Sequence, residues 1–119
     1  ISAEFRKKLL NKQLPKNIVI LENDAKDLSN EIPDESIDKL LAINVIYFLK
    51  PIREYILEFK RILKPSGTIT AQVGSQDKKP KQVNNWLKLF DKSFGNTALD
   101  RVYIPSFDCS WNFATSINR

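Results

Sequence analysis

Residues Ile37 to Gly67 read IDKLLAINVIYFLKPIREYILEFKRILKPSG and contain the clearest pattern of alternating strand and helix in the chain. An apolar run from Ile37 to Ile43 ends at the polar residue Asn44, and an amphipathic segment follows it. A second apolar run, Thr68 to Val73, comes directly after Gly67. Parallel neighbouring strands need a crossover connection, which is usually a helix. The stretch therefore predicts a strand, a crossover helix and a second, parallel strand.

The amphipathic segment has the spacing of a helix that packs on a sheet. Pro51 suits its first turn, and apolar residues then recur at i, i+3, i+4 and i+7. The predicted sheet-facing residues are Ile52, Tyr55, Ile56, Phe59, Ile62 and Leu63. We expect Glu54 and Glu58 to face water in surface ion pairs worth tenths of a kcal/mol. Pro65 and Gly67 should end the helix, with Gly67 free to adopt a positive φ.

The rest of the chain predicts two helices and three strands. Ser2 can cap a helix that runs to about Gln13, and the β-branched run from Asn17 to Glu22 is interpreted as a strand buried on both faces. A second helix is expected from about Lys79 to Lys92. Two strands, Ala98 to Ile104 and Ser110 to Ile117, have no room for a crossover between them and should form an antiparallel hairpin.

The composition is that of one small globular domain spanning residues 1–119. The chain is 42% hydrophobic and 28% charged, which is ordinary for a folded domain. Its net charge of +5 suggests nucleic acid as a partner, but the lysines are spread along the chain. The densest group, Lys78-Lys79-Pro80-Lys81, is too short for a basic arm. Nucleic-acid binding is therefore the least favoured function.

Several residue types are rare or missing, and each gap excludes a class of function. Cys109 is the only cysteine, so no internal disulfide can form, which is compatible with a reducing compartment such as the cytoplasm. The chain has no histidine and so lacks the commonest metal ligand and the usual partner of a thiol nucleophile. No apolar run reaches the roughly 20 residues of a membrane span. The chain begins at Ile1 without any methionine, and we expect a fragment.

Three motifs, taken in order, resemble those of a known enzyme family. Asn23-Asp24-Ala25 follows a predicted strand, Ser36-Ile37-Asp38 leads into the next, and Arg61-Ile62-Leu63-Lys64-Pro65-Ser66-Gly67 ends the helix. The corresponding family patterns are G-D-A, S-F-D and R-V-L-K-P-G-G. From residue 2 to 75 the chain resembles a class I S-adenosylmethionine-dependent methyltransferase of the UbiE-like type (methyltransferase type 11). The resemblance implies an α/β, Rossmann-like sheet, mostly parallel, with an antiparallel hairpin at its end.

The resemblance also implies a set of cofactor-binding residues. Asp24 would accept a hydrogen bond from the adenine amino group of S-adenosylmethionine, and the backbone N–H of Ala25 would meet an adenine ring nitrogen. Asn44 ends the strand that contacts the methionine part of the cofactor. The pocket near the transferable methyl would be lined by Val45, Ile46 and Tyr47. No residue is assigned a catalytic role, because methyl transfer depends largely on positioning. Four aromatic residues are interpreted as core or interface residues rather than a substrate cage: Tyr47, Phe48, Trp86 and Trp111.

Other family features are missing from the sequence. The glycine-rich cofactor loop should precede everything seen here, yet Gly67, Gly74 and Gly95 are the only glycines and none lies in such a loop. The family's first two strands and the acidic residue that holds the ribose are also missing. We therefore expect half a cofactor site and weak or no cofactor binding by this chain alone.

The missing strands leave the strand Ile37 to Ile43 with an open apolar edge, and exposed apolar edges pair with something. Either the strand Asn17 to Glu22 collapses onto this edge or another chain supplies a strand, and we expect a homodimer or a strand-swapped assembly. Two functions stay open: part of a methyltransferase acting on a small molecule, or a degenerate methyltransferase-like module for binding or assembly.

Overall fold

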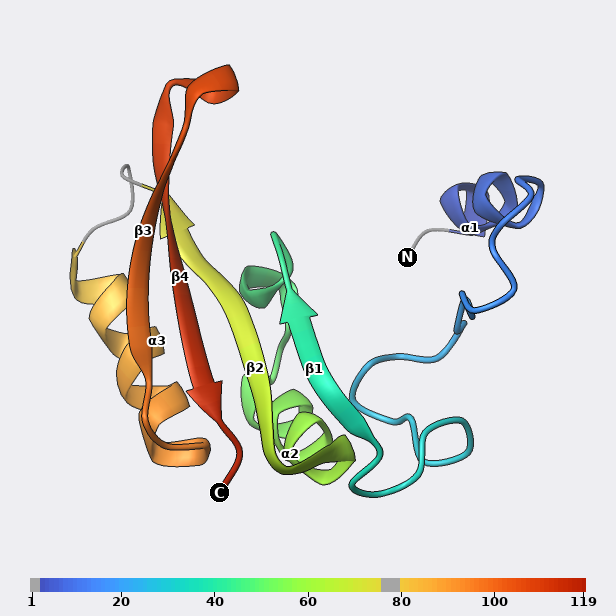
Figure 1. Ribbon diagram of the computed structural model, residues 1–119, viewed down its shortest axis with the longest axis horizontal. Helices are drawn as coiled ribbons and strands as arrows, with labels where there is room; N and C mark the ends of the chain where they lie inside the picture. Colours follow the sequence, from blue (N-terminus) through green and yellow to red (C-terminus); the bar gives the residue numbers. More distant parts are fainter. Residues whose placement is uncertain (1–2, 76–79) are drawn as a thin grey trace.

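The computed structural model describes residues 3–75 and 80–119, and Figure 1 shows the arrangement of its elements. In chain order these are α1 (Ala3–Leu10), β1 (Ile37–Ala42), the 3-10 turn η1 (Ile46–Phe48), α2 (Ile52–Ile62), β2 (Leu63–Ser75), α3 (Pro80–Ser93), β3 (Ala98–Ile104), the 3-10 turn η2 (Pro105–Phe107) and β4 (Cys109–Ile117). Ser2, Lys78 and Lys79, which figure in the sequence predictions, lie outside the described residues.

The four strands form one sheet in the order β1-β2-β4-β3. β1 and β2 are parallel, with Lys39 opposite Thr68 and Ala42 opposite Ala71. β4 runs antiparallel to β2 and to β3. The predicted strand, crossover helix and parallel strand are confirmed, as is the antiparallel hairpin. The α/β fold is therefore confirmed, but the sheet is mixed, with one parallel and two antiparallel pairings, rather than mostly parallel as expected.

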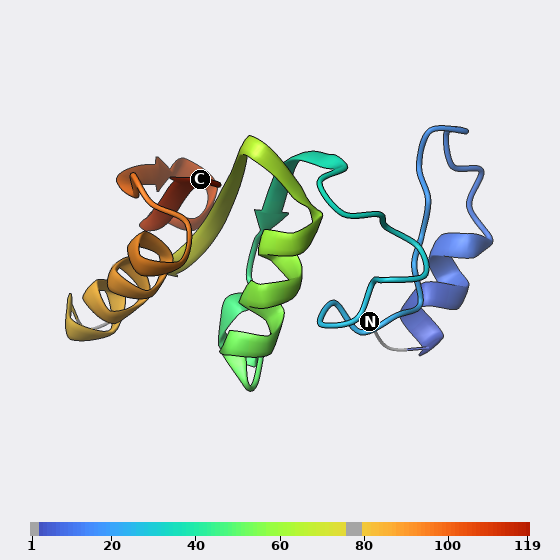
Figure 2. The ribbon, with the colours of Figure 1, turned by 90° about the horizontal axis from the view of Figure 1, so that it is seen from below.

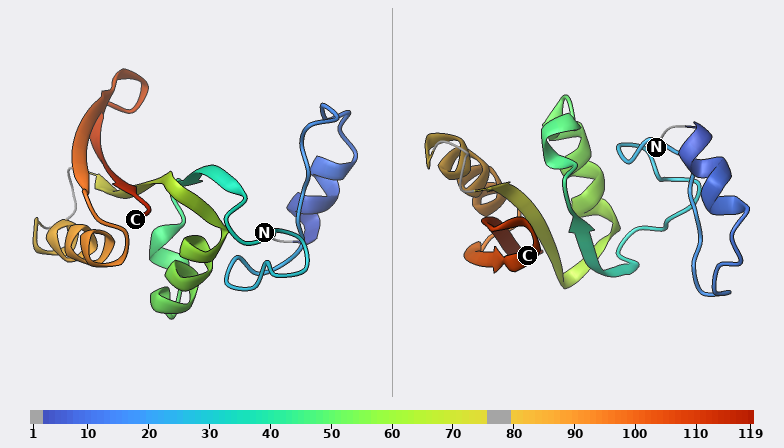
Figure 3. Two further views of the ribbon diagram at one scale, coloured as in Figure 1. Left: turned by 60° about the horizontal axis from the view of Figure 1, so that its bottom comes forward. Right: turned by 90° about the horizontal axis from the view of Figure 1, so that it is seen from above.

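Both long helices cover the same face of the sheet (Figures 2 and 3). The predicted apolar face of α2 is confirmed, because Tyr55, Ile56, Phe59 and Ile62 are buried. Phe90 of α3 packs in the same core with Ile69, Ala71, Val73 and Ala114 of the sheet. In the part of the chain that the structure describes, no helix covers the opposite face. Leu41, which alternates with the core-facing Leu40 and Ala42, is 70% exposed there.

The predicted strand from Asn17 to Glu22 is wrong. This segment is irregular, and Val19 is 78% exposed. Figure 1 shows it beside α1, away from the sheet, where Arg6 and Glu22 form an ion pair of 3.4 Å. A β-branched run becomes a strand only when a neighbouring strand satisfies its backbone groups. The helix before it is also shorter than expected, since α1 ends at Leu10.

The junction between α2 and β2 differs from the prediction in its backbone. α2 ends at Ile62, β2 begins at once, and the positive φ of 66° falls on Ser66 rather than on Gly67. Gly67 is required for a different reason. A Cβ there would lie 2.9 Å from the carbonyl oxygen of Lys64 and 3.1 Å from that of Ile37. The glycine therefore allows β1 and β2 to approach each other.

Candidate functional site

The carboxyl end of β1 turns sharply at Asn44, and the neighbouring strand fixes this turn. Asn44 adopts a φ of 57°, and its backbone N–H donates to Oε1 of the buried Gln72 in β2 at 3.1 Å. η1 follows and buries Ile46, whereas Val45 stays partly exposed. The turn therefore presents Val45 at the carboxyl end of the sheet while its backbone is tied to β2.

Asp24 lies in a tight turn that precedes β1. The N–H of Lys26 donates to Oδ1 of Asp24 at 3.3 Å, and the N–H of Asp27 donates to its carbonyl oxygen at 2.9 Å. The hydroxyl of Tyr55 on α2 also donates to the Asp24 carboxylate, which lowers the pKa of Asp24 and raises that of Tyr55. The exposed Asp24 is therefore an ionised hydrogen-bond acceptor at neutral pH.

α2 anchors the loop after Asp24 through a buried carboxylate. Glu58 accepts hydrogen bonds from the backbone N–H of Leu28 and from Nε of Arg61, both at 2.5 Å. Arg61 also donates to Oδ1 of Asp34 at 2.6 Å and to the carbonyl oxygen of Ile32 at 3.1 Å. The hydrogen bond from Arg61 lowers the pKa of Glu58. These contacts hold the irregular loop against a regular helix.

The expectation that Glu58 faces water is wrong, because Glu58 is buried. Helical periodicity assigns it to the polar face, but the loop at Leu28 folds over that position. The three-residue spacing of Glu58 and Arg61 indicates that the two side chains can meet. It gives no sign that a distant backbone N–H would bind there.

An apolar groove runs between this loop and β1. It has a volume of about 430 Å³. Ala25 and Leu28 come from the loop, and Val45 and Leu49 from the turn and the chain that follows it. The remaining lining residues come from β1, α2 and the end of the loop: Ile32, Ile37, Lys39, Leu40, Leu41, Ala42, Phe59 and Ile62. Ala25 and Val45, far apart in the sequence, therefore line the same groove.

Asp24 borders a second cavity next to the groove. This cavity measures about 580 Å³ and shares Ala25, Leu28 and Leu49 with the groove. Of the four residues predicted to bind the cofactor, the structure thus places Asp24, Ala25 and Val45 around adjoining cavities. Asn44 is instead held against β2 by its hydrogen bond to Gln72.

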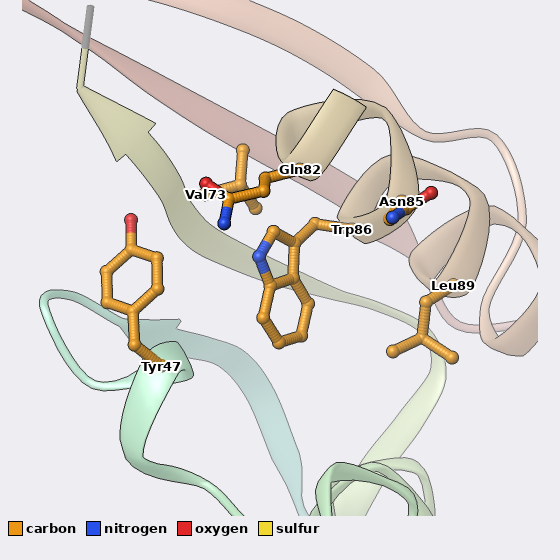
Figure 4. Close-up of a pocket in the computed structure, with 6 residues that line it drawn as sticks. All are labelled: Tyr47, Val73, Gln82, Asn85, Trp86 and Leu89. Carbon is orange, nitrogen blue, oxygen red and sulfur yellow. The ribbon is translucent and has the colours of Figure 1, made fainter. Parts of the chain in front are cut away.

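A third cavity lies on the α3 side of η1, and Figure 4 shows its residues. It measures about 350 Å³ and is lined by Tyr47, Val73, Gln82, Asn85, Trp86 and Leu89. The rings of Tyr47 and Trp86 meet edge to face, with centroids 6.5 Å apart and an interplanar angle of 81°. Burial raises the pKa of Tyr47. The sequence predicted a core or interface role for both aromatic residues, but it held no signal that they would meet.

The residues present fit one end of an adenosine-containing cofactor. An ionised carboxylate and a neighbouring backbone N–H, at Asp24 and Ala25, suit the polar edge of an adenine, and the apolar groove suits its faces. The glycines do not form a cofactor loop, because Gly67 and Gly74 lie in β2 and Gly95 follows α3.

Among residues 3–75 and 80–119, no group of three or more histidine, cysteine, aspartate or glutamate side chains could hold a metal. No helix in these ranges could cross a membrane.

Comparisons with solved structures show what this fold is similar to. A SAM dependent methyltransferase from Aquifex aeolicus superposes with a TM-score of 0.59 and 18% identity, over 95% of this chain and 60% of that one. The CMeT domain of the citrinin polyketide synthase superposes with a TM-score of 0.63 and 14% identity, over 98% of this chain and 36% of that one. The PH0226 protein from Pyrococcus horikoshii OT3 superposes with a TM-score of 0.54 and 15% identity, over 97% of this chain and 64% of that one.

At such identities the structural likeness shows the fold alone, and this chain spans 36% to 64% of the length of these three structures. No curated protein matches the chain. A family model described as a methyltransferase domain matches residues 1–71, a range that holds the Asp24 turn, β1, α2 and the first part of β2. The resemblance drawn from the sequence motifs is thereby confirmed. Since the match covers more than half of the chain, this protein belongs to the methyltransferase domain family.

Proposed function

We propose that the chain supplies the adenine side of an S-adenosylmethionine site in a methyltransferase that acts on a small molecule. One observation carries the proposal: the Asp24–Ala25 turn and the Val45 turn border adjoining cavities beside β1. In open α/β sheets, ligands bind in the space just outside the carboxyl ends of the strands. Family membership supports the choice of ligand.

Each residue has a defined part in this proposal. The ionised Asp24 accepts from the adenine amino group, and the N–H of Ala25 donates to an adenine ring nitrogen. Val45 and Leu49 cover the apolar surface of the cofactor. When bound, S-adenosylmethionine supplies an activated methyl group on its sulfonium, and the work of the chain is to bind and orient it.

Calorimetry with S-adenosylhomocysteine tests this function. Because the chain carries one side of the site, we expect a weak dissociation constant on the order of 1 mM. Asp24→Ala should weaken binding further, whereas Asp27→Ala, a neighbouring carboxylate in the same loop, should not. Binding in the micromolar range would show that the site is more complete than proposed. Equal binding by both variants would remove Asp24 from the site.

A second candidate function is assembly through the edge of β1, which the apolar groove and the exposed Leu41 favour. We propose that a second copy of this chain pairs with it, β1 against β1 in antiparallel fashion about a two-fold axis. Sedimentation equilibrium distinguishes the two functions. A dimer that does not bind S-adenosylhomocysteine would favour an assembly module. A monomer that binds S-adenosylhomocysteine would favour the cofactor site.

A further inference from the structure

The cavity on the α3 side of η1 is separate from the groove assigned to the cofactor. Tyr47 lines it from η1, Val73 lines it from β2, and the other four residues project from α3: Gln82, Asn85, Trp86 and Leu89. Val45 of the same turn lines the groove on the β1 side. One short segment therefore forms a wall of both spaces. The cavity volume of about 350 Å³ lies within the range of small-molecule sites.

The walls of this cavity have a distinct chemistry. Among the residues that the structure describes, the six that line the cavity are uncharged, although the chain has a net charge of +5. Trp86 and Tyr47 present aromatic surface from two different elements, and Val73 and Leu89 add aliphatic surface. The exposed side chains of Gln82 and Asn85 place two carboxamides on α3, one turn apart, at the rim. Carboxamides both donate and accept hydrogen bonds.

We propose that this cavity binds a neutral, planar aromatic molecule that carries a hydroxyl or similar polar group at its edge. Aromatic side chains favour aromatic ligands through edge-to-face and offset contacts. A charged ligand would lose hydration without gaining a charged partner among these six described residues. The two carboxamides at the rim would meet the polar edge of the ligand. The sequence alone favoured a core or interface role for Tyr47 and Trp86. Because both residues line one cavity, we now assign them to a ligand site.

If the proposed function holds, this ligand is the methyl acceptor, and that part of the inference rests on the proposed function. Val45 and Tyr47 are two residues apart in the same turn and line the two spaces. The binding of an aromatic molecule stands on the cavity itself and does not depend on the cofactor.

Nuclear magnetic resonance of the two tryptophan indoles tests the inference with 2-naphthol as the probe. Trp86 lines the cavity, whereas Trp111 stacks on Phe107 in the hairpin with ring centroids 5.8 Å apart. Titration of the full chain should shift the indole N–H signal of Trp86 and leave that of Trp111 in place. Equal shifts of both signals, or no shift of Trp86, would overturn the proposal.

Variants and probe analogues sharpen the test. Trp86→Leu should weaken 2-naphthol binding about tenfold, whereas Trp111→Leu should change it less than about twofold. The charged 2-naphthoate and the saturated decahydro-2-naphthol should both bind more weakly than 2-naphthol to the unaltered chain. Tighter binding of 2-naphthoate would show attraction to the net positive charge and would overturn the proposal. Binding of 2-naphthol without any binding of S-adenosylhomocysteine would keep this site and reject the proposed function.

Discussion

β3 and β1 form the two edges of the sheet, and they differ in what borders them. β3 carries Asp100 and Arg101 at its centre and belongs to a local hairpin with β4. The end of that hairpin is tied by a hydrogen bond of 2.7 Å from the Tyr103 hydroxyl to Oδ1 of Asp108. β1 carries charge only at its amino end and is bordered by an apolar groove.

The two edges differ in how their charged and apolar residues are arranged. Central charges discourage an edge strand from pairing, and apolar edges invite it. The β3 edge carries such charges at Asp100 and Arg101, beside the exposed side chains of Leu99, Val102 and Tyr103. The groove beside β1 is formed together with the loop from Asp24 to Asp34. Glu58 and Arg61 of α2 hold this loop in place. Changes that loosen β1 or this loop should affect binding, and matched changes on β3 should not.

The largest expected effect comes from closing the space between β1 and β2. Gly67→Val would place a Cβ 2.9 Å from one backbone carbonyl oxygen and 3.1 Å from another. Backbone atoms cannot move aside cheaply, so we expect a loss of about 3 kcal/mol in the free energy of unfolding. Urea unfolding measures it. Ala98→Val on the exposed β3 edge is the control and should stay within about 0.5 kcal/mol. Equal losses for the two variants would show that the close approach of β1 and β2 does not require a glycine at position 67.

The next effect comes from releasing the loop that borders the groove. Glu58→Ala leaves the N–H of Leu28 without its acceptor, which should cost about 1–3 kcal/mol of unfolding free energy. Glu54→Ala on the same helix removes only an exposed ion pair with Lys26, so its cost should be below about 1 kcal/mol. Chemical denaturation of both variants gives the comparison. A smaller loss for Glu58→Ala than for Glu54→Ala would mean that the loop is not held by Glu58.

The same carboxylate makes stability depend on pH in acid. The hydrogen bond from Arg61 lowers the pKa of folded Glu58 below its ordinary value of 4.5. Between the two values the unfolded state binds more protons, so the contribution of Glu58 is full above 4.5 and is lost as the pH falls through the folded pKa. Unfolding midpoints measured from pH 6 downward should fall more steeply for the native sequence than for Glu58→Ala. Parallel profiles would show that Glu58 does not titrate in this way.

A smaller effect concerns the two edges directly. Leu41→Lys places a charge on the exposed apolar part of β1 and should raise the dissociation constant of the proposed dimer at least about tenfold. Leu99→Lys makes the same change on β3, where the side chain is 46% exposed, and should leave association unchanged. Sedimentation equilibrium of the two variants decides the point. Dissociation by Leu99→Lys alone would place the interface on the hairpin.

The smallest effect tests the Asp24 turn. Tyr55→Phe removes the hydroxyl that donates to the Asp24 carboxylate, so the pKa of Asp24 should rise toward its ordinary value of 3.8. A carbon-detected titration of this carboxyl group measures the change. Tyr103→Phe, which removes a similar hydrogen bond in the hairpin, should leave the pKa of Asp24 unaltered. An unchanged pKa in Tyr55→Phe would remove Tyr55 from the site.

The sequence predicts those parts of the molecule whose causes are local. Helical spacing gave the buried face of α2, and the short connection between Ile104 and Ser110 gave the hairpin. The motif at Asp24-Ala25 led to the family. The errors at Asn17–Glu22 and Glu58 have a common physical origin, since each depends on a neighbour distant in the sequence. The meeting of Tyr47 and Trp86 also depends on how α3 packs beside η1, which no local pattern encodes.

A map of amide chemical-shift changes on addition of S-adenosylhomocysteine tests whether the β1 side of the sheet binds the cofactor. We expect shifts at the amides of Ala25 and Val45, on the β1 side of the sheet, and none at Arg101 in β3. Asp24→Ala should reduce the shifts at both positions. Shifts centred on the hairpin, or no shift at Ala25 and Val45 at several-millimolar ligand, would contradict the claim that the β1 edge carries the cofactor side of a methyltransferase site.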